Sequence, residues 1–205
     1  FDSPKNISLG KEFTVKIKLD HIAYKLPEGN KLRLSLSNAY WPLVWPVSNP
    51  AKLVVKEGYL SLPLRQSTKS DEWVFPKSVV SKPWQGKEMR KPRNKRQVLF
   101  DEATDEVFLD IEDDFGSYKD LQNKLVISSS AREKWSIHPN DPLSAKGETH
   151  WTEERSRGDW SIRTETFSSM TSDKSYFYLK ARVEAYEKAK LIFTKKMESK
   201  IKRVL

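Results

Sequence analysis

The chain has 205 residues and a formal net charge of +9, with 37% hydrophobic and 32% charged residues. This length allows one large domain or two modest ones, and seven Trp, seven Tyr and nine Phe are too many aromatic residues for a disordered chain. The absence of cysteine excludes disulfides, thiolate zinc sites and a cysteine nucleophile.

Targeting signals are absent from the sequence as given. No apolar run approaches the ~18 residues of a membrane-spanning helix, and no signal peptide is visible, so we expect no membrane partner and a cytoplasmic location. The chain opens at Phe1 without an initiator Met, from which we expect it to be a piece of a longer protein.

Period-2 alternation predicts antiparallel strands in the first 66 residues. The clearest case is residues 12–20, where Phe13, Val15 and Ile17 alternate with polar residues. Further short strands are predicted over residues 31–37, 52–56 and 59–63.

Two Trp-Pro pairs stand four residues apart in the segment 39–46. Proline lacks an N–H, so this segment can be neither a helix interior nor a central strand. Its aromatic residues each remove roughly 150–250 Å² from water when buried. We therefore predict a rigid corner, with Tyr40, Trp41 and Trp45 as candidate interdomain packing residues.

Residues 67–97 lose the alternating pattern and are predicted to form a basic, proline-containing linker. Seven Lys or Arg stand between Lys82 and Arg96 against a single Glu88. A basic run with an aromatic neighbour, Trp84, raises nucleic-acid binding as an alternative. One aromatic residue makes a poor stacking platform, however, so a solvated loop is preferred.

Strand patterns return over residues 98–205, which are predicted to form an antiparallel C-terminal domain. A hairpin is expected around residues 103–105, a turn at Phe115-Gly116, and separate short strands near residues 125–127 and 135–137. Residues 184–196 could be a helix on propensity alone, but alternation over 176–183 favours strands. The fold class is therefore all-β.

Catalytic and metal motifs are weak or missing. The seven glycines include no pair four residues apart, which excludes a Gly-x-Ser-x-Gly nucleophile elbow. His138, Asp141 and Ser144 share one short turn and are predicted to form a hydrogen-bonded loop, although a triad assembled by folding remains open. The acidic residues 110–114 lack the spacing of a calcium loop and are predicted to lie at a solvated hairpin end. We predict no catalytic residue, cofactor site or metal site.

Residues 155–160 combine charge, a turn glycine and an aromatic residue. Arg157, Asp159 and Trp160 are predicted to form a structural turn in which an Arg–Asp pair could fix a strand crossing.

Several phrases of the sequence together resemble one family. They are the run 23–46 with its Trp-Pro pairs, then Leu60-Ser61-Leu62-Pro63-Leu64-Arg65, Asp141-Pro142-Leu143-Ser144-Ala145, Arg157-Gly158-Asp159-Trp160 and Glu184-Ala185-Tyr186-Glu187. In this order they resemble the C-terminal non-catalytic region of CocE/NonD-type hydrolases, which is related to the C-terminal domain of X-Pro dipeptidyl-peptidases. Asn30 stands where the family usually has His.

The resemblance implies a parent serine hydrolase, an acyl esterase or X-Pro dipeptidyl-peptidase, with an N-terminal α/β-hydrolase domain and a jelly-roll-like antiparallel β-sandwich. Residues 1–66 would then be the final strands of that sandwich, and residues 98–205 a β-rich C-terminal extension. The resemblance maps no catalytic residue onto this chain. The expected partner is the catalytic domain, with a homo-oligomer as a further possibility. An independent carbohydrate- or ligand-binding module, using Trp73, Trp84 or Trp135, stays open as an alternative.

Overall fold

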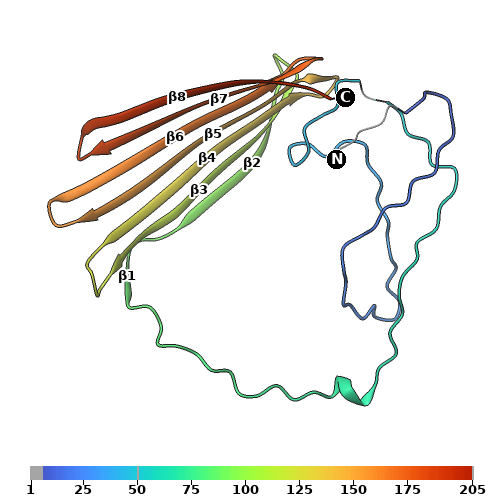
Figure 1. Cartoon of the computed structure of the whole chain (residues 1–205), viewed down its shortest axis with the longest axis horizontal. Helices are drawn as coiled ribbons and strands as arrows, with labels where there is room; N and C mark the ends of the chain where they lie inside the picture. The colour runs from blue at the N-terminus through green and yellow to red at the C-terminus, as the bar shows by residue number, and fades with distance from the viewer. Residues whose placement is uncertain (1–6, 50, 205) are drawn as a thin grey trace.

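The protein is described by a computed structural model covering residues 7–49 and 51–204. Its main feature is one open sheet of eight antiparallel strands, which lies beside an extended N-terminal segment and a long arched linker (Figure 1). The prediction of an all-β, antiparallel fold is confirmed. Among the described residues, no helix is long and apolar enough to cross a membrane.

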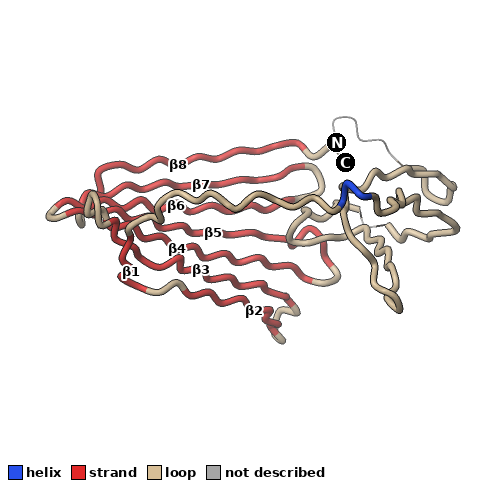
Figure 2. Tube along the Cα trace, turned by 90° about the horizontal axis from the view of Figure 1, so that it is seen from below, coloured by secondary structure: helices blue, strands red, loops and turns tan. Residues whose placement is uncertain are grey.

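The strands follow one another along the chain as a meander (Figure 2). A short 3₁₀ helix, η1 (Lys69–Asp71), precedes them. The strands are β1 (Gly86–Arg90), β2 (Arg93–Asp101), β3 (Glu106–Asp120), β4 (Val126–His138), β5 (Asp141–Arg157), β6 (Trp160–Ser172), β7 (Tyr176–Glu187) and β8 (Lys190–Lys202). The strand prediction for residues 184–196 is confirmed, and so is the hairpin around residues 103–105.

The edge of β3 is covered by two strands in tandem. β2 pairs with Glu106 to Asp114 and β1 with Ser117 to Asp120, so the chain crosses from one to the other beside Gly116. Gly116 has φ +81°, and a Cβ there would lie 2.6 Å from the carbonyl oxygen of Arg90. Glycine is required at this bulge because the backbone is left-handed and another backbone segment approaches closely.

The structure corrects three details of the strand predictions. Residues 115–116 form a bulge within β3 and not a turn, and the separate strands at 125–127 and 135–137 are one strand, β4. β1 and β2 also begin inside the predicted linker. Local turn signals mislead here because a bulge preserves the ladder on both sides of an irregular residue.

The strands predicted within residues 1–66 do not appear as paired strands in the described part of that segment, 7–49 and 51–66. Residues 1–6 and Pro50 of this predicted domain lie outside the described residues. The described residues of this segment form turns and stretches without assigned structure, and Phe13, Val15 and Ile17 remain 50–64% exposed. Alternation gives a segment an apolar face, but a strand forms only where a second strand supplies the ladder.

The two faces of the sheet differ in chemistry. Side chains directly opposite one another in an antiparallel ladder share a face, so the register sorts the residues into rows. We call one face the apolar face; one of its rows is Val98, Leu109, Trp135, Gly147, Met170 and Leu179. We call the other the charged face; one of its rows is Lys95, Glu112, Arg132, His150, Phe167, Arg182 and Lys196.

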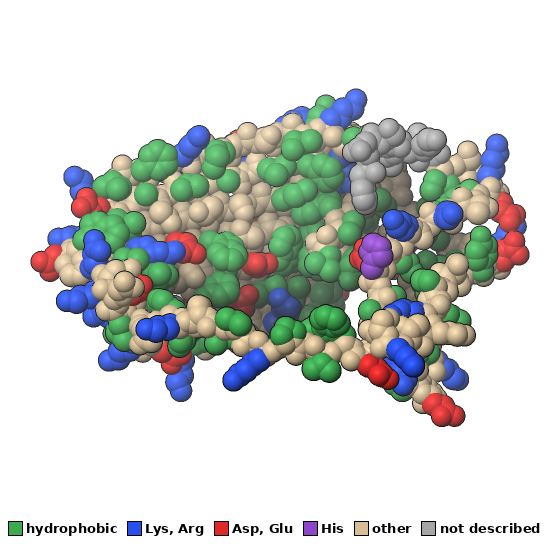
Figure 3. Space-filling view, turned by 60° about the horizontal axis from the view of Figure 1, so that its bottom comes forward, with side chains coloured by type: hydrophobic (Ala, Val, Ile, Leu, Met, Phe, Trp, Pro, Cys, Tyr) green, Lys and Arg blue, Asp and Glu red, His purple; other side chains and the backbone are tan. Residues whose placement is uncertain are grey.

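The apolar face is poorly covered. Hydrophobic side chains gather over the sheet in the view from below (Figure 3). Among the described hydrophobic residues, only Ile111, Ala131 and Ala145 are buried, whereas Phe193 is 52% exposed. A single-layer sheet has no second layer to remove this surface from water.

We expect Gly116→Ala to destabilise the sheet by about 1–3 kcal/mol, because any Cβ meets the backbone between β1 and β2 and the left-handed φ is strained. Urea unfolding followed by circular dichroism measures this. Gly58→Ala is the matched control, because nothing lies within 4 Å of a Cβ at that position. Equal stability of the two variants would contradict the role given to Gly116.

Candidate interdomain interface

The Trp-Pro corner, residues 39–46, forms a compact turn. The Val44 N–H donates to the Tyr40 carbonyl at 2.8 Å, and the peptide bond between Trp41 and Pro42 is cis. The rings of Trp41 and Trp45 meet edge to face with centroids 4.9 Å apart. The two indoles therefore form one aromatic unit that projects from a rigid backbone.

This aromatic unit packs on the apolar face near one end of the sheet. Trp41 meets Trp135 of β4 at 5.8 Å, and Trp45 meets Phe177 of β7 at 6.3 Å, both nearly perpendicular. The Trp135 ring lies over Gly147, where a Cβ would come within 2.5 Å of it. A glycine opposite Trp135 thus lets the indole lie flat as a platform for the corner.

Arg203 locks the corner to the sheet from the C-terminal side. It is only 7% exposed, and its guanidinium donates to Ser172 Oγ at 2.9 Å, to the Asp173 carbonyl at 3.1 Å and to the Pro46 carbonyl at 2.6 Å. It also lies 4.7 Å above the ring of Phe177. Burial lowers the pKa of Arg203, and the nearby charge of Asp173 opposes that shift.

Ser172 joins the two sides of this junction. Its hydroxyl oxygen accepts from Trp45 Nε1 at 2.9 Å and from the Arg203 guanidinium. The contact links residues 127 positions apart in the sequence. Sequence reasoning missed Ser172 and Arg203, because one ends a strand without any motif and the other stands in a basic tail.

The turn that follows Ser172 is held by Asp173. Its carboxylate accepts from the N–H groups of Ser175 and Tyr176 at 2.6 and 2.7 Å and from the Tyr178 hydroxyl at 2.6 Å. The hydrogen bond from Tyr178 has the largest effect in holding the pKa of Asp173 below its ordinary value, and the two N–H groups add to it. The same hydrogen bond raises the pKa of Tyr178.

The three predicted packing residues differ in their burial. Trp41 and Trp45 are partly buried against the chain's own sheet, whereas Tyr40 is 65% exposed. The corner thus joins the N-terminal segment to the C-terminal sheet, and contact with a separate catalytic domain stays a prediction.

The segment 157–160 forms the two-residue connection between β5 and β6, in which Arg157 is paired with Trp160. Gly158 has φ +59°, which glycine adopts without strain. Arg157 and Asp159 form no ion pair in the described structure, and Trp160 is 42% exposed. The turn lies at the residues predicted to form it, but the predicted pair between the Arg157 and Asp159 side chains is not formed.

The residues His138, Asp141 and Ser144 do come together, but not as a catalytic relay. Ser144 Oγ accepts from the His138 backbone N–H at 2.7 Å and donates to the Asp141 carbonyl at 2.6 Å. The imidazole Nδ1 accepts from the N–H of Asn140 at 3.2 Å. A nucleophile would need its hydroxyl directed at the imidazole, so this turn has the geometry of the predicted hydrogen-bonded loop.

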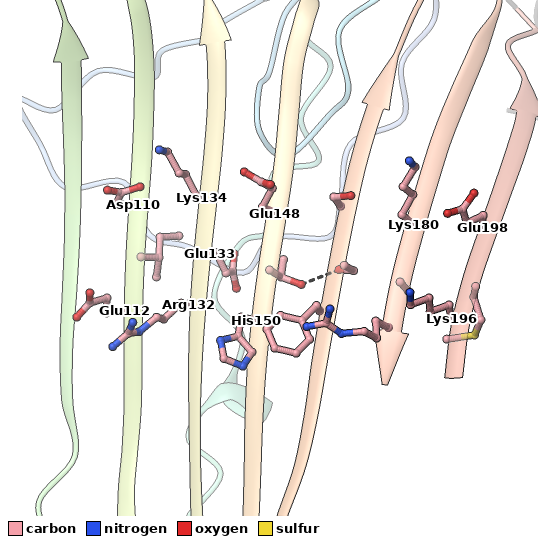
Figure 4. Close-up of a pocket in the computed structure, with 18 residues that line it drawn as sticks. Asp110, Glu112, Arg132, Glu133, Lys134, Glu148, His150, Lys180, Lys196 and Glu198 are labelled. Carbon is pink, nitrogen blue, oxygen red and sulfur yellow. Dashed lines mark hydrogen bonds between the residues drawn. The ribbon is translucent and has the colours of Figure 1, made fainter. Parts of the chain in front are cut away.

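A shallow hollow of about 690 Å³ crosses the charged face (Figure 4). Its side chains carry both signs: Asp110, Lys134 and Glu148 alternate across three strands, whereas the like charges of Arg182 and Lys196 lie opposite each other. His150 stacks on Phe167 with ring centroids 4.1 Å apart and meets a Glu165 carboxylate oxygen at 3.2 Å. Opposite charges compensate one another across the strands, which is the arrangement of a solvated face.

The basic run and the acidic cluster of the sequence face each other. Arg93 pairs in register with Asp114 and Lys95 with Glu112, and the Asp114 carboxylate forms ion pairs with Arg90 and Arg93. The acidic residues lie within β3, not at the predicted hairpin end. Among the described residues, no three His, Asp or Glu side chains come together as a metal site. The ion pairs engage Arg90 and Arg93 of the basic run, and nucleic-acid binding by the run stays a prediction.

The three Trp residues of the alternative ligand-binding hypothesis differ in their exposure and contacts. Trp73 is 70% exposed, and Trp84 donates from Nε1 to Asp120 at 3.3 Å. Trp135 contacts Trp41 instead. No ring contact joins Trp73, Trp84 and Trp135 in the described structure, so they do not form a stacking platform.

Comparison with protein families gives a match in the N-terminal segment. Residues 1–69 match the X-Pro dipeptidyl-peptidase C-terminal non-catalytic domain, which is 69 of the 205 residues. This confirms the resemblance drawn from the phrases within that segment, and the matched domain is non-catalytic. Comparisons with curated proteins and with solved structures gave no match.

Replacing Arg203 with Met should release the corner, because three donated hydrogen bonds are lost and the accepting oxygens are left without that partner. We expect a loss of about 2 kcal/mol in the free energy of unfolding and faster proteolysis of residues 7–65. Arg157→Met, in an exposed turn, is the matched control. An Arg203→Met protein as stable and protease-resistant as the control would contradict the junction.

The depressed pKa of Asp173 predicts a pH dependence of stability. Its contribution is complete above the unfolded pKa of about 3.9 and is lost as the pH falls through the lower folded pKa. Asp173→Asn should therefore lower stability near neutral pH and flatten the dependence in acid. Tyr178→Phe should reproduce part of this effect. Urea unfolding at about pH 6 and about pH 3 tests it, and parallel pH profiles for all three proteins would exclude it.

Proposed function

We propose that this chain is the non-catalytic C-terminal β module of an α/β-hydrolase-type serine hydrolase, similar to acyl esterases and X-Pro dipeptidyl-peptidases. The match of residues 1–69 to a non-catalytic domain of that enzyme class carries the proposal. In this role the module packs against the catalytic domain and helps to shape the substrate cleft or the oligomer. The chemistry is supplied by the catalytic domain of the parent protein.

The exposure of apolar side chains supports a packing role. Trp151 is 38% and Phe193 52% exposed on the apolar face, and the alternating residues near Phe13 are also exposed. Large exposed apolar patches on a protein surface commonly mark interaction sites. A catalytic domain lying against this face would provide the missing second layer.

In this proposal the Trp-Pro corner positions the sheet. It belongs to the segment that matches the family, and it is bound to the sheet through Ser172 and Arg203. If the N-terminal segment completes a sandwich in the parent, the corner fixes the sheet relative to that sandwich. The sheet would then be held at a defined position beside the substrate cleft.

The test is hydrolysis of p-nitrophenyl esters and X-Pro p-nitroanilides by the isolated chain and by the full-length parent. We expect turnover by the parent and none by the isolated chain. A parent without a nucleophile-elbow serine would contradict the proposal. Turnover by the isolated chain alone would also overturn it and make His138 and His150 the first residues to replace.

The packing role is tested by a pair of variants made in both proteins. Trp151→Glu places a charge on the apolar face, and Ser169→Glu places the same charge on the charged face. We expect Trp151→Glu to lower the thermal stability and activity of the parent more than Ser169→Glu does. An equal effect of the two variants in the parent would contradict docking through the apolar face.

A further inference from the structure

The outer edge of β8 presents an unpaired strand. Within residues 7–49 and 51–204, β8 ends the strand order of the sheet and pairs with β7 alone, and every one of its residues is exposed. Such an edge offers a row of free N–H and C=O groups to another strand. Edge pairing gives affinity through main-chain hydrogen bonds and specificity through the side chains that meet.

The backbone directions along this edge follow from one observed bond. The Arg203 N–H donates to the Ser175 carbonyl at 2.8 Å, directly beyond the pair of Lys202 and Tyr176. Hydrogen-bonded and non-bonded pairs alternate along an antiparallel ladder. The N–H groups of the even-numbered residues from 194 to 202 therefore point away from β7, and their edge is open.

We propose that β8 pairs antiparallel with β8 of a second copy of this chain, about a two-fold axis at Met197, to give one continuous sheet. In an isologous contact, residue i meets residue j and j meets i. A two-fold axis normal to the sheet keeps each face on its own side, so apolar and charged faces both continue across the contact. The inference does not depend on the proposed hydrolase parent.

The sequence of β8 is self-complementary in this register. Lys196 meets Glu198 of the second copy, and the reverse pair repeats the contact. On the apolar face Phe193 meets Ile201, and Met197 meets itself at the axis. Lys196 and Glu198 carry opposite charges on the charged face, so their contact between copies is attractive, as the pair of Lys180 and Glu198 is within the sheet.

Other registers for pairing β8 with a second β8 are disfavoured, mostly because they place like charges opposite each other. β8 carries five lysines against one glutamate, so most alignments place lysine against lysine. A centre at Lys196 sets that residue against itself, and a centre at Glu198 sets Lys196 against Lys200. A centre at Thr194 avoids lysine pairs but sets Phe193 against Lys195. The register at Met197 has no like-charge pair within β8; it matches Phe193 with Ile201, and its one apolar residue set against a lysine is Ile192, which meets Lys202 at the end of the strand.

The opposite edge of the sheet is less suited to pairing. β1 and β2 share it in tandem and are interrupted at Lys91-Pro92, with an irregularity between Glu88 and Arg90. Self-pairing of β2 about Gln97 would set Arg96 against Val98. Bulges, prolines and interruptions of this kind protect an edge, which leaves β8 as the open one.

A cysteine scan tests the register directly, because the chain has no cysteine of its own. Non-bonded antiparallel partners have Cα atoms about 4.5 Å apart, within the range that a disulfide spans. Met197→Cys should form a disulfide-linked dimer under mild oxidation at least tenfold faster than Phe193→Cys, Lys195→Cys, Ser199→Cys or Ile201→Cys. A cysteine at position 195 would lie about 13 Å from its symmetry mate.

Charge reversal provides the second test, by sedimentation equilibrium of the full chain. Glu198→Lys and Lys196→Glu should each weaken the dimer at least fivefold, and mixing the two variants should restore it, because each then supplies the charge that the other lacks. Lys195→Glu, which meets Ser199, is the matched control. A monomeric wild-type chain, a fastest crosslink at any other position, or no rescue on mixing would overturn the proposal.

Discussion

The position of the N-terminal segment on the sheet depends most on the hydroxyl of Ser172, which accepts from Trp45 and from Arg203 at the end of the sheet. These two donors come from opposite ends of the chain, so one oxygen joins the N-terminal corner, β6 and the C-terminal residues. The junction is partly buried, which strengthens each hydrogen bond and raises the cost of leaving a donor unpaired. The long N-terminal segment has few other contacts with the sheet, and its position follows from this junction.

The second constraint is the one-sided chemistry of the sheet. Long, regular strands place apolar residues on one face and compensating charges on the other, and the charged face needs no cover. The apolar face is only partly covered where Trp41 meets Trp135. In the proposed place beside a catalytic domain, that domain would supply a further layer over this exposed surface.

Sequence reasoning succeeded where the signal is local. Alternation over residues 176–183 identified β7, and the paired Trp-Pro residues identified the segment that anchors the N-terminal part. It failed where a feature depends on residues distant in the sequence. The bulge at Gly116 exists because the chain crosses between β1 and β2 there, and Arg203 gains its role only through the carbonyl of Pro46. The strands expected before residue 66 have no pairing strand in the described part of that segment. A local pattern cannot reveal whether such a pairing strand exists.

The most direct measurement is a double-mutant cycle between Trp45→Phe and Ser172→Ala, with free energies from urea unfolding. Phe keeps most of the ring contact with Phe177 but removes the indole N–H, so the cycle isolates the hydrogen bond across 127 positions of sequence. We expect a coupling free energy of about 1 kcal/mol between the two side chains. Additive effects of the two replacements would show that the corner and the sheet are energetically independent, and would contradict it.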